Sequence, residues 1–378
     1  MRIVEDETAR DLRAAVRTLV GRHIQPLIDK QGQGKPVDAD TLRAMFVQIA
    51  TTGLFGARAP EEHNTGLPIS LTGVVLEELP AFVGVATVAQ EATIFRLGHG
   101  AGPRLRAAYL PDLVAGELIA GSAISEPEVG SASNHVTTSM TVRDGTCRVV
   151  GSKLWITNGS VADVLVVAAR NSETGRVGRV LIDTRTTPLE ARNLPMSGLV
   201  EGHLCELELD VEVPAEHVFG DSASGSAVMT TSWTLNRTSM GLIGCSLARQ
   251  ALTEAIRFAK ERKQFGKPIG AHQLVQQLLA DAATEIEAGR LLCYRALSLM
   301  EEGQDAVVAS SMAKAFATER AVQAILKCQQ VAGAAGLSEE YPFARLLRDA
   351  RMLPIPDGTT QIQQLILGRA LTGLSAFS

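Results

Sequence analysis

Hydrophobic residues in the first third of the chain recur at intervals of three and four residues, which is typical of helices with one buried face. Glycine and proline residues at positions 53, 56, 60 and 66 interrupt this pattern, as expected for a loop between helices. We therefore predict a helical region over residues 1–120. The positions that carry the helical spacing are Leu12, Ala15, Val16, Leu19, Leu71, Val74, Val75 and Leu79.

The pattern changes to a period of two in the middle of the chain. Between Cys205 and Val213 every second residue is apolar, the residues between them are acidic, and Pro214 follows. This alternation predicts a strand with one buried and one solvated face. Asp144-Gly145 predicts a hairpin turn, and residues 161–169 predict a buried strand. We therefore expect a β domain over residues 121–226.

Helical spacing returns in the last third of the chain and predicts at least three long helices over residues 227–378. Helices, strands and helices thus follow one another in separate blocks, which indicates an α+β, mostly α, fold and not an alternating parallel sheet. Gly100-Ala101-Gly102 lacks the third glycine of a dinucleotide-binding turn. The apolar positions are Ala248, Leu252, Ala255, Ile256, Ala259, Leu274, Leu278, Ile286, Leu291, Ala313, Ala317, Val322 and Ile325.

Composition narrows the class of partner. The 378 residues carry a net charge of −5 and only 4% aromatic residues, which gives no reason to expect nucleic-acid binding. No run of about 18 apolar residues predicts a membrane span, and no apolar leader follows the first residues, so we expect a cytoplasmic protein. The five cysteines and seven histidines are scattered without metal-ligand spacing, so we expect no metal site and buried, unpaired thiols.

Two segments of the middle region combine small residues, hydroxyls and an aromatic ring. Residues 123–131 form a loop whose N–H groups and serines suit a phosphate or a flat cofactor, or which is a plain turn. Residues 151–159 contain Trp155 and Thr157, whose indole and hydroxyl could cover and bind a cofactor ring. The alternative for Trp155 is a role in the hydrophobic core.

Two further segments lie in the helical C-terminal region. Residues 262–268 begin with Arg262, either a phosphate ligand or a basic residue that complements a helix end. Residues 356–363 begin with Pro356 and Asp357, and Asp357 is either a helix N-cap or a general base on a turn.

Together these segments resemble the acyl-CoA dehydrogenase family, and the resemblance extends over essentially the whole chain. The order and spacing of the matches carry it, since no single match is specific. The matching segments are SEPEVGSA at 125–132, WITNG at 155–159, VPAEH at 213–217, RKQFGKP at 262–268, QVAGAAG at 330–336, EYP at 340–342, RDAR at 348–351 and PDGTTQIQ at 356–363.

The resemblance implies an α-helical N-terminal domain, a middle β-sandwich or barrel and a C-terminal four-helix bundle, with FAD as the cofactor. It also implies a homo-oligomer, a tetramer or dimer, in which a neighbouring subunit reaches the ADP half of FAD. The implied cofactor-binding residues are Ile124, Ser125, Gly130, Ser131, Trp155, Ile156 and Thr157 at the flavin, Arg262, Gln264, Phe265, Gln273, Gln330 and Gly333 at the pyrophosphate and adenosine, and Thr359 and Gln361 closing the pocket.

The implied reaction is removal of an α-proton from an acyl thioester and of a β-hydride by the flavin, with electron-transfer flavoprotein or another acceptor as partner. Asp357 stands where the family has its catalytic Glu, and Ser131, Arg237 and Gly358 are implied at the substrate. The family's second position for a base is Asn236, which cannot take a proton. The shorter Asp and Pro356, in place of the usual Tyr, favour a bulky, branched or ring-containing acyl group.

Three alternatives follow from the departures from the family pattern, which also include Ala132 in place of the loop Asp. The substrate could be an acyl group on a carrier protein instead of coenzyme A. The chain could be a non-catalytic flavin-binding relative, since its base is Asp357. It could also be an oxidase that passes electrons to oxygen.

Overall fold

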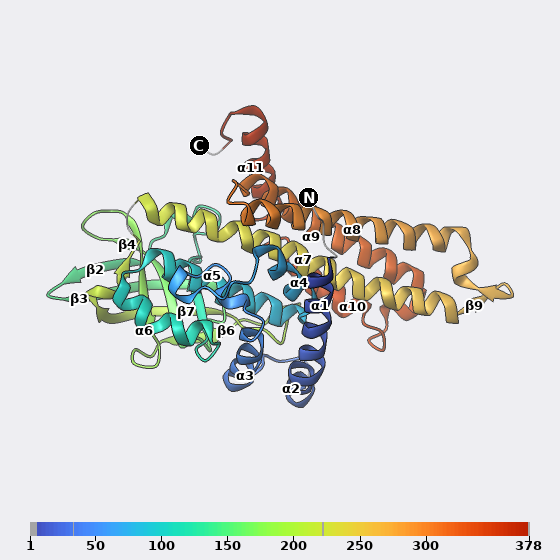
Figure 1. Cartoon of the computed structure of the whole chain (residues 1–378), viewed down its shortest axis with the longest axis horizontal. Coiled ribbons are helices and arrows are strands. Elements are labelled where there is room, and N and C mark those ends of the chain that lie inside the picture. The colour runs from blue at the N-terminus through green and yellow to red at the C-terminus, as the bar shows by residue number, and fades with distance from the viewer. Residues whose placement is uncertain (1–5, 33, 221–222, 377–378) are drawn as a thin grey trace.

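The computed structural model describes residues 6–32, 34–220 and 223–376. The chain is divided into a helical N-terminal part, a sheet and a helical C-terminal part, in that order along the sequence. Figure 1 shows the sheet at one end of an elongated molecule and the long C-terminal helices extending to the other end. The predicted fold class is therefore confirmed.

The N-terminal part contains α1 to α6, and the helices predicted around Leu12 and Leu71 are present. Asp6 caps α1 by accepting a hydrogen bond from the Ala9 N–H at 2.9 Å. Helices α4 and α5 are apolar on most sides and buried, and they form the centre of the molecule. The helix bounds are Glu7–Leu19 (α1), Gln25–Gln31 (α2), Ala39–Ala50 (α3), Ile69–Glu78 (α4), Ala81–Gly100 (α5) and Pro103–Val114 (α6).

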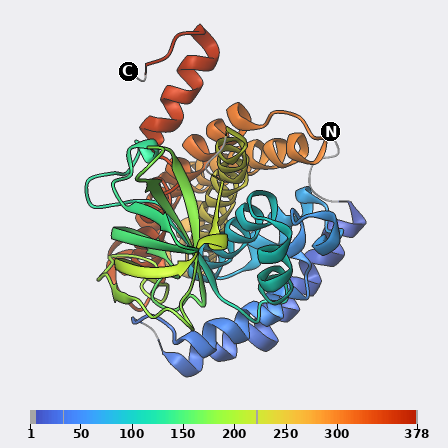
Figure 2. The ribbon, with the colours of Figure 1, turned by 90° about the vertical axis from the view of Figure 1, so that its left-hand side faces the viewer.

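The middle part is one hydrogen-bonded sheet of eight strands, in the order β6-β7-β3-β2-β4-β5-β8, with β1 parallel to β4. Figure 2 shows that the sheet curves around its own core and that helices cover one side. The strand bounds are Ala120–Ala123 (β1), Ser139–Arg143 (β2), Thr146–Thr157 (β3), Val164–Asn171 (β4), Val177–Asp183 (β5), Glu190–Asn193 (β6), Leu204–Pro214 (β7) and Val218–Phe219 (β8).

The predicted turn and strands of this part are confirmed. Asp144 and Gly145 both have positive φ, 48° and 79°, and join β2 to β3 as a tight hairpin. On β7 the side chains of Cys205, Leu207 and Val213 are buried while the acidic residues between them face outward or are half-buried. The strand predicted over residues 161–169 begins three residues later, at Val164.

The C-terminal part contains five helices and a small hairpin at the tip of an arm. Two glycines allow the long helices to approach closely: a Cβ on Gly241 or Gly289 would lie 2.6 Å or 3.0 Å from a cysteine sulfur. All five cysteines are buried and unpaired, as expected. The bounds are Ala223–Glu261 (α7), Gln273–Glu301 (α8), Val307–Ala332 (α9), Phe343–Met352 (α10), Thr360–Thr372 (α11), and Lys263–Gln264 (β9) with Lys267–Pro268 (β10).

Helices α7 and α8 extend beyond the body of the molecule as an arm, with β9 and β10 at its tip (Figure 1). This explains why the helical spacing of α8 does not mean full burial there: Leu274 is 75% exposed and Leu291 is 38% exposed, whereas Ile286 is buried. Among residues 6–32, 34–220 and 223–376, no helix is both long and apolar enough to cross a membrane.

Candidate active site

A buried carboxylate anchors the loop over residues 124–131 to the sheet. Glu126 accepts hydrogen bonds from the Thr137 N–H at 2.6 Å and the Thr138 N–H at 2.9 Å, and the Lys153 ammonium lies 2.8 Å from it. Both charged side chains are almost fully buried. Burial alone would raise the pKa of Glu126, but the hydrogen bonds from Lys153 and the threonines lower it to about 2. The loop is therefore held against β3 by a permanent charge.

The anchored loop lies beside an exposed indole. The Leu154 N–H donates to the Ser125 carbonyl at 2.9 Å, which joins the loop to the residue before Trp155. The pairing of β3 with β7 shifts between Lys153 and Ile156, and Trp155 has φ of 64°. This irregularity turns the side chain outward, so that Trp155 is 53% exposed. Its alternative assignment to the hydrophobic core is therefore wrong.

The residues that flank this indole give it a fixed position. Ile156 is buried in the sheet core, and Asn158 donates to the Ala86 and Ala120 carbonyls, each at 3.1 Å. Gly130 and Ser131, at the end of the anchored loop, are exposed. An exposed aromatic ring, a half-buried Thr157 two residues further along β3 and a loop that is hydrogen-bonded to Leu154 and ends in exposed residues thus lie close together in the chain's hydrogen-bonded framework. This donor set fits the ring system of a flavin.

Asp357 lies on a strained turn between α10 and α11. Asp357 has φ of 56° and Gly358 has φ of 92°. The Asn236 amide donates to the Asp357 carboxylate at 3.1 Å, and Arg237 Nε donates to the Asp357 carbonyl at 3.3 Å. The N-cap of α11 is Thr359, whose hydroxyl accepts from the Ile362 N–H, so the alternative of Asp357 as the cap is wrong.

A buried lysine and a buried glutamine fix the backbone of this turn. Lys314 Nζ donates to the Pro354 carbonyl at 3.0 Å and to the Gly358 carbonyl at 2.6 Å. Gln363 Nε2 donates to the Asp357 carbonyl at 3.1 Å and to the Gly358 carbonyl at 2.8 Å. Burial lowers the pKa of Lys314 to about 8, although the charge of Asp357 acts in the opposite direction. The carboxylate is therefore held in one orientation by the packed bundle.

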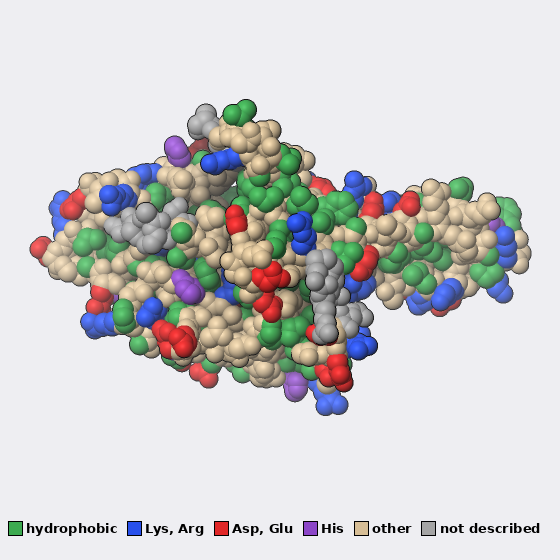
Figure 3. Space-filling model, turned by 45° about the horizontal axis from the view of Figure 1, so that its top comes forward, with side chains coloured by type: hydrophobic (Ala, Val, Ile, Leu, Met, Phe, Trp, Pro, Cys, Tyr) green, Lys and Arg blue, Asp and Glu red, His purple; other side chains and the backbone are tan. Residues whose placement is uncertain are grey.

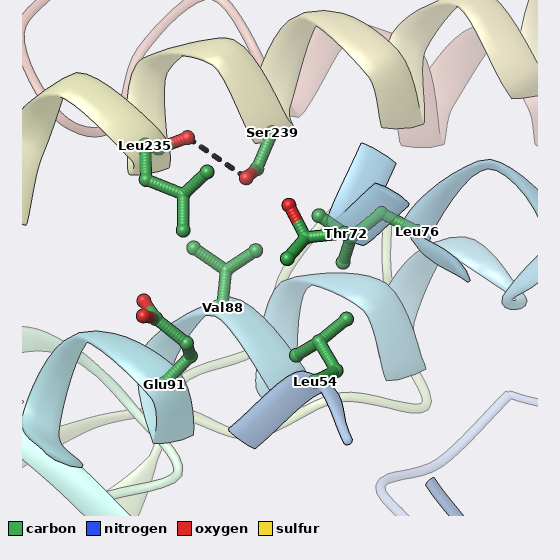
Figure 4. A pocket seen from close by; sticks show the side chains of 7 residues that line it. All are labelled: Leu54, Thr72, Leu76, Val88, Glu91, Leu235 and Ser239. Atoms are coloured by element: carbon green, nitrogen blue, oxygen red, sulfur yellow. Dashed lines mark hydrogen bonds between the residues drawn. The ribbon is translucent and has the colours of Figure 1, made fainter. Parts of the chain in front are cut away.

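A small pocket opens between α4, α5 and α7, one residue away from Asn236 along α7. Figure 4 shows apolar side chains from all three helices around it, with the carboxylate of Glu91 at one side. Arg58 holds that carboxylate with two hydrogen bonds of 2.8 Å and 2.6 Å. The pocket therefore combines an apolar lining with one carboxylate, which is paired with an arginine. Its lining residues are Leu54, Thr72, Leu76, Val88, Glu91, Leu235 and Ser239.

The residues expected at the pyrophosphate and adenosine are not brought to the indole. Arg262, Gln264, Phe265 and Gln273 lie at the tip of the arm, and all are exposed. From Arg237, which donates to the Asp357 carbonyl, to the end of α7 at Glu261 the helix rises about 36 Å, so the tip of the arm lies far from the Asp357 turn. Gln330 and Gly333 lie at the end of α9, again exposed, while Gln361 is exposed in the first turn of α11. One chain thus carries two separate groups of predicted cofactor residues.

Sequence reasoning missed four residues that build the site: Glu126, Lys153, Lys314 and Gln363. Three of them lie inside the segments that were singled out, but their role is to fix backbone carbonyls and N–H groups that only the fold brings together. Glu126 and Lys153 are charged residues within short segments of small and apolar residues, and this contrast could have indicated a buried ion pair. Asn236 was discounted as a base, and the structure shows that it instead holds the carboxylate that remains.

Comparison with known proteins covers all three parts of the chain. Family models match for the acyl-CoA dehydrogenase N-terminal domain at residues 6–117, the middle domain at 121–211 and the C-terminal domain at 223–372. Cyclohex-1-ene-1-carbonyl-CoA dehydrogenase of Geobacter metallireducens is 34% identical over 369 residues, covering 94% of this chain and 96% of that protein. Cyclohexane-1-carbonyl-CoA dehydrogenase of the same organism is 35% identical over 289 residues, 75% of this chain and 76% of the relative.

Solved structures agree with the family models. A glutaryl-CoA dehydrogenase from Mycobacterium smegmatis superimposes with a TM-score of 0.90 at 28% identity, covering 100% of this chain and 98% of that one. Butyryl-CoA dehydrogenase from Megasphaera elsdenii superimposes with a TM-score of 0.89 at 26% identity, covering 98% of this chain and 100% of that one. The predicted resemblance is confirmed, and the chain belongs to the acyl-CoA dehydrogenase family.

Proposed function

We propose that this chain introduces a 2,3 double bond into an acyl-CoA thioester, with Asp357 as the base that takes the α-proton. The chain is an oxidoreductase of the class that acts on CH–CH bonds, and FAD is its cofactor. The observation that carries the proposal is the carboxylate of Asp357, which Asn236 of α7 holds on a turn fixed by Lys314 and Gln363. No other carboxylate on the turn or on the adjoining stretch of α7 can take this role, because position 236 is an asparagine.

The residues around the indole fit the flavin, and we infer that Ser125, Ser131, Trp155 and Thr157 hold it. The bound FAD supplies the redox chemistry by accepting the β-hydride. The protein supplies the geometry. Glu126 fixes the loop that we propose contacts the flavin, and Lys314 fixes the turn that carries the proposed base, Asp357.

Removal of an α-proton from a thioester requires that the negative charge on the thioester oxygen be stabilised as it forms. Among the described residues, the backbone N–H of Asp357 donates to no protein acceptor. It lies on the same strained turn as the carboxylate, so it can donate to the thioester oxygen while the side chain takes the proton. Arg237 is buried and donates to the Asp357 carbonyl, so it helps to fix the turn that carries this N–H.

We propose a ring-containing or branched acyl group as the substrate. Asp is one methylene shorter than Glu, and Pro356 is exposed where a tyrosine ring would fill space, so both changes leave room for a wide acyl group near its α-carbon. The names of the two Geobacter metallireducens relatives, which describe cyclohexane and cyclohexene carbonyl-CoA dehydrogenases, support the same class.

Anaerobic bleaching of the flavin tests the reaction and the substrate class together. The yellow protein is mixed with straight, branched and cyclic acyl-CoA thioesters of equal carbon number. We expect the cyclic or branched members to bleach the flavin at least about 10-fold faster than the straight-chain ones, since a mismatch of shape in an apolar pocket is worth one to three kcal/mol. A yellow protein that no coenzyme A thioester bleaches would contradict the proposal and direct attention to carrier-bound substrates.

We infer that two copies of the chain complete each cofactor site. The group at the tip of the arm lies far from the Asp357 turn of its own chain, because α7 rises about 36 Å between Arg237, which donates to the Asp357 carbonyl, and Glu261. Phe265 is 93% exposed and Leu274 is 75% exposed at this tip, and Figure 3 shows hydrophobic side chains reaching the surface of the arm. Such exposed apolar residues suit contact with a second copy. The number of copies in the oligomer, two or four, is measured in the experiment described next.

Replacing Phe265 by Ser is expected to lower the FAD content of the purified protein and to shift it toward a smaller oligomer. The reason is that the exposed ring, held at φ of 51°, loses its apolar contact area. Size-exclusion chromatography with light scattering and the ratio of flavin to protein absorbance measure both effects. Lys260→Ser, which alters an exposed residue on the same arm, serves as the control; equal FAD content in both variants would contradict the inference.

An electron-transfer flavoprotein is the acceptor we propose for the electrons, with molecular oxygen as the competing acceptor. Release of hydrogen peroxide in air distinguishes the two.

A further inference from the structure

Lys314, in the first half of α9, is a fully buried cation without a carboxylate partner. Its Nζ donates to two backbone carbonyls, those of Pro354 at 3.0 Å and Gly358 at 2.6 Å. Among the residues that the structure describes it forms no ion pair, whereas the equally buried Lys153 lies 2.8 Å from Glu126. Burying a charge without an opposite charge beside it is unfavourable. The fold therefore keeps this ammonium at a cost in stability.

A positive charge is not needed to hold these carbonyls. Gln363 donates to the Gly358 carbonyl at 2.8 Å and to the Asp357 carbonyl at 3.1 Å with a neutral amide. The Gly358 carbonyl thus already has a neutral donor, so hydrogen bonding alone does not account for an ammonium at position 314. What Lys314 adds is its charge, and that charge is bonded to the residue next to the proposed base.

The charged groups that act on Lys314 belong to the same turn and its immediate neighbours. They are Asp357 on the turn, Arg237 of α7 and Glu319 of α9. Arg237 donates to the Asp357 carbonyl at 3.3 Å, and Glu319 accepts a hydrogen bond from the Thr360 hydroxyl at 2.6 Å. Helix α9 therefore holds the turn from two positions, with Lys314 on its carbonyls and Glu319 at the start of α11.

The other helices packed against α9 direct their charged side chains elsewhere. Glu285 and Arg290 of α8 form ion pairs with other residues, and Asp349 of α10 accepts a hydrogen bond from a backbone N–H of the middle part. The remaining charged side chains of α8, α10 and α11 are exposed. On α7 the charged residue that follows Arg237 is Arg249, about three turns further along the helix. The opposite charge that matters to Lys314 is thus that of the proposed base.

The proton of Lys314 can leave within an accessible pH range. Burial lowers the pKa of Lys314 from its ordinary value of 10.5 to about 8, and the charge of Asp357 opposes that shift. At neutral pH the ammonium is charged, and its hydrogen bonds to the two carbonyls are about twice as strong as those of a neutral donor. Above this range both the charge and the additional strength are lost.

We propose that Lys314 is a positioning residue for the reaction, whose positive charge holds the turn of Asp357 in the geometry that takes the α-proton. This inference rests on the proposed function and deepens it by adding a charged group that acts through the base. Proton transfer depends steeply on the placement of the base, and Lys314 bonds carbonyls on both sides of Asp357 along the turn. The reaction should therefore slow when the ammonium loses its proton.

The pH dependence of anaerobic flavin bleaching tests the proposal on the FAD-loaded protein. The probe is the thioester of the panel above that bleaches the flavin fastest, at saturating concentration, from pH 6 to pH 9.5. For the unaltered protein we expect the rate to fall above about pH 8, approaching a 10-fold loss for each pH unit as one proton leaves.

Lys314→Met removes the charge and keeps an unbranched side chain of similar length. We expect it to be about 10–100-fold slower at pH 7 and to lack the fall above pH 8. The thioester concentration that gives half the maximal rate should change by less than about 3-fold, since the residue acts on the chemical step and not on binding. Gln363→Leu is the matched control: it removes neutral hydrogen bonds from the same turn, so it should slow the reaction but keep the fall above pH 8.

A double variant tests whether Lys314 acts through the base. In the Asp357→Asn background, Lys314→Met should change the small remaining rate by less than about 2-fold. The reason is that the effects of two residues that act on one shared group are not additive.

Denaturation gives a readout that does not need turnover. The pKa of Lys314 is about 8 in the folded protein and 10.5 as its ordinary value, so between these values the unfolded chain binds the proton and the folded chain does not. The contribution of this residue to stability therefore rises as the pH rises through that window. Urea midpoints measured from pH 7 to pH 10 should rise for the unaltered protein relative to Lys314→Met.

The outcomes that overturn the proposal are distinct from one another. A rate that does not fall above pH 8 in the unaltered protein shows that the charge does not control the step, and this result does not depend on the folding of any variant. A fall that persists in Lys314→Met belongs to another group, and an equal loss with and without Asp357→Asn shows that Lys314 acts elsewhere. Parallel urea midpoints show that no buried charge is present. If no thioester bleaches the flavin, the proposed function itself fails, whereas bleaching at a rate independent of Lys314 leaves that function standing.

Discussion

Asp357→Asn is expected to bleach its flavin about 10²–10⁴-fold more slowly than the unaltered protein, the range for loss of a general base. Asn keeps the size of the side chain and can still pair with Asn236, but it cannot take a proton. The turn around it is fixed by the bonds from Lys314 and Gln363 to backbone carbonyls, which the change does not touch. FAD content and melting temperature should therefore remain close to those of the unaltered protein. Stopped-flow absorbance under anaerobic conditions measures the rate.

Asp357→Glu is the informative companion variant. It keeps the base and moves it outward by one methylene, toward the position that the family's usual residue occupies. We expect Glu to slow the reaction with cyclic thioesters and to favour straight-chain ones. The longer side chain would occupy space that a wide acyl group needs near its α-carbon, and a displaced group reacts more slowly. Full activity in Asp357→Asn would remove this residue from the mechanism.

Glu126→Ala is expected to destabilise the protein by about 3–5 kcal/mol and to release FAD, because it leaves the Lys153 ammonium buried and alone. Lys153 is fully buried, and its other partner is the Ile124 carbonyl at 3.1 Å. The loop that carries Ser125 and Ser131 loses its anchor at the same time. Urea denaturation and the flavin-to-protein ratio measure the two effects.

Two controls separate the ion pair from the loop. Glu128→Ala changes an exposed residue of the same loop and should alter stability by no more than about 0.5 kcal/mol. The double variant Glu126→Leu with Lys153→Met replaces both charges by apolar groups and should recover much of the stability, though not the FAD. Equal stability of the Glu126 and Glu128 variants would contradict the anchoring role.

The same residue predicts a pH dependence. The pKa of Glu126 is lowered in the folded protein to about 2, below its ordinary value of 4.5. Between these values the unfolded chain binds the proton and the folded chain does not, so stability falls as the pH falls through this window. Denaturation midpoints measured from pH 6 to pH 3 should decline more steeply for the unaltered protein than for Glu126→Gln. Parallel curves would show that the carboxylate carries no such linkage.

The order of the three parts and most of the elements could be predicted from the sequence because they depend on local periodicity. The alternation along β7, the Asp-Gly turn at 144–145 and the spacing of α9 each act over a few residues, and the structure confirms them. The motif segments were also visible, since each combines unusual residue types in a short stretch. Their order along the chain was sufficient to indicate the family.

What periodicity could not reveal is which residue meets which across long separations. Asn236 and Asp357 lie 121 positions apart, and Lys314 reaches the turn from a different helix. The outward turn of Trp155 depends on a register shift between two strands, so its sequence looked equally suited to the core. The exposure of Leu274 depends on the arm leaving the body of the protein, which helical spacing does not report.

The sequence by itself thus determined the family and its class of chemistry, because the segments proposed for the base and the cofactor are short and local, so their residue types can be read without the fold. Only the tertiary structure decided how that chemistry is confined. Packing brought Glu126 to Lys153 and fixed the carboxylate of Asp357 against α7. Burial and pairing are properties of groups that are distant in sequence, and they set both the charge and the orientation on which the reaction depends.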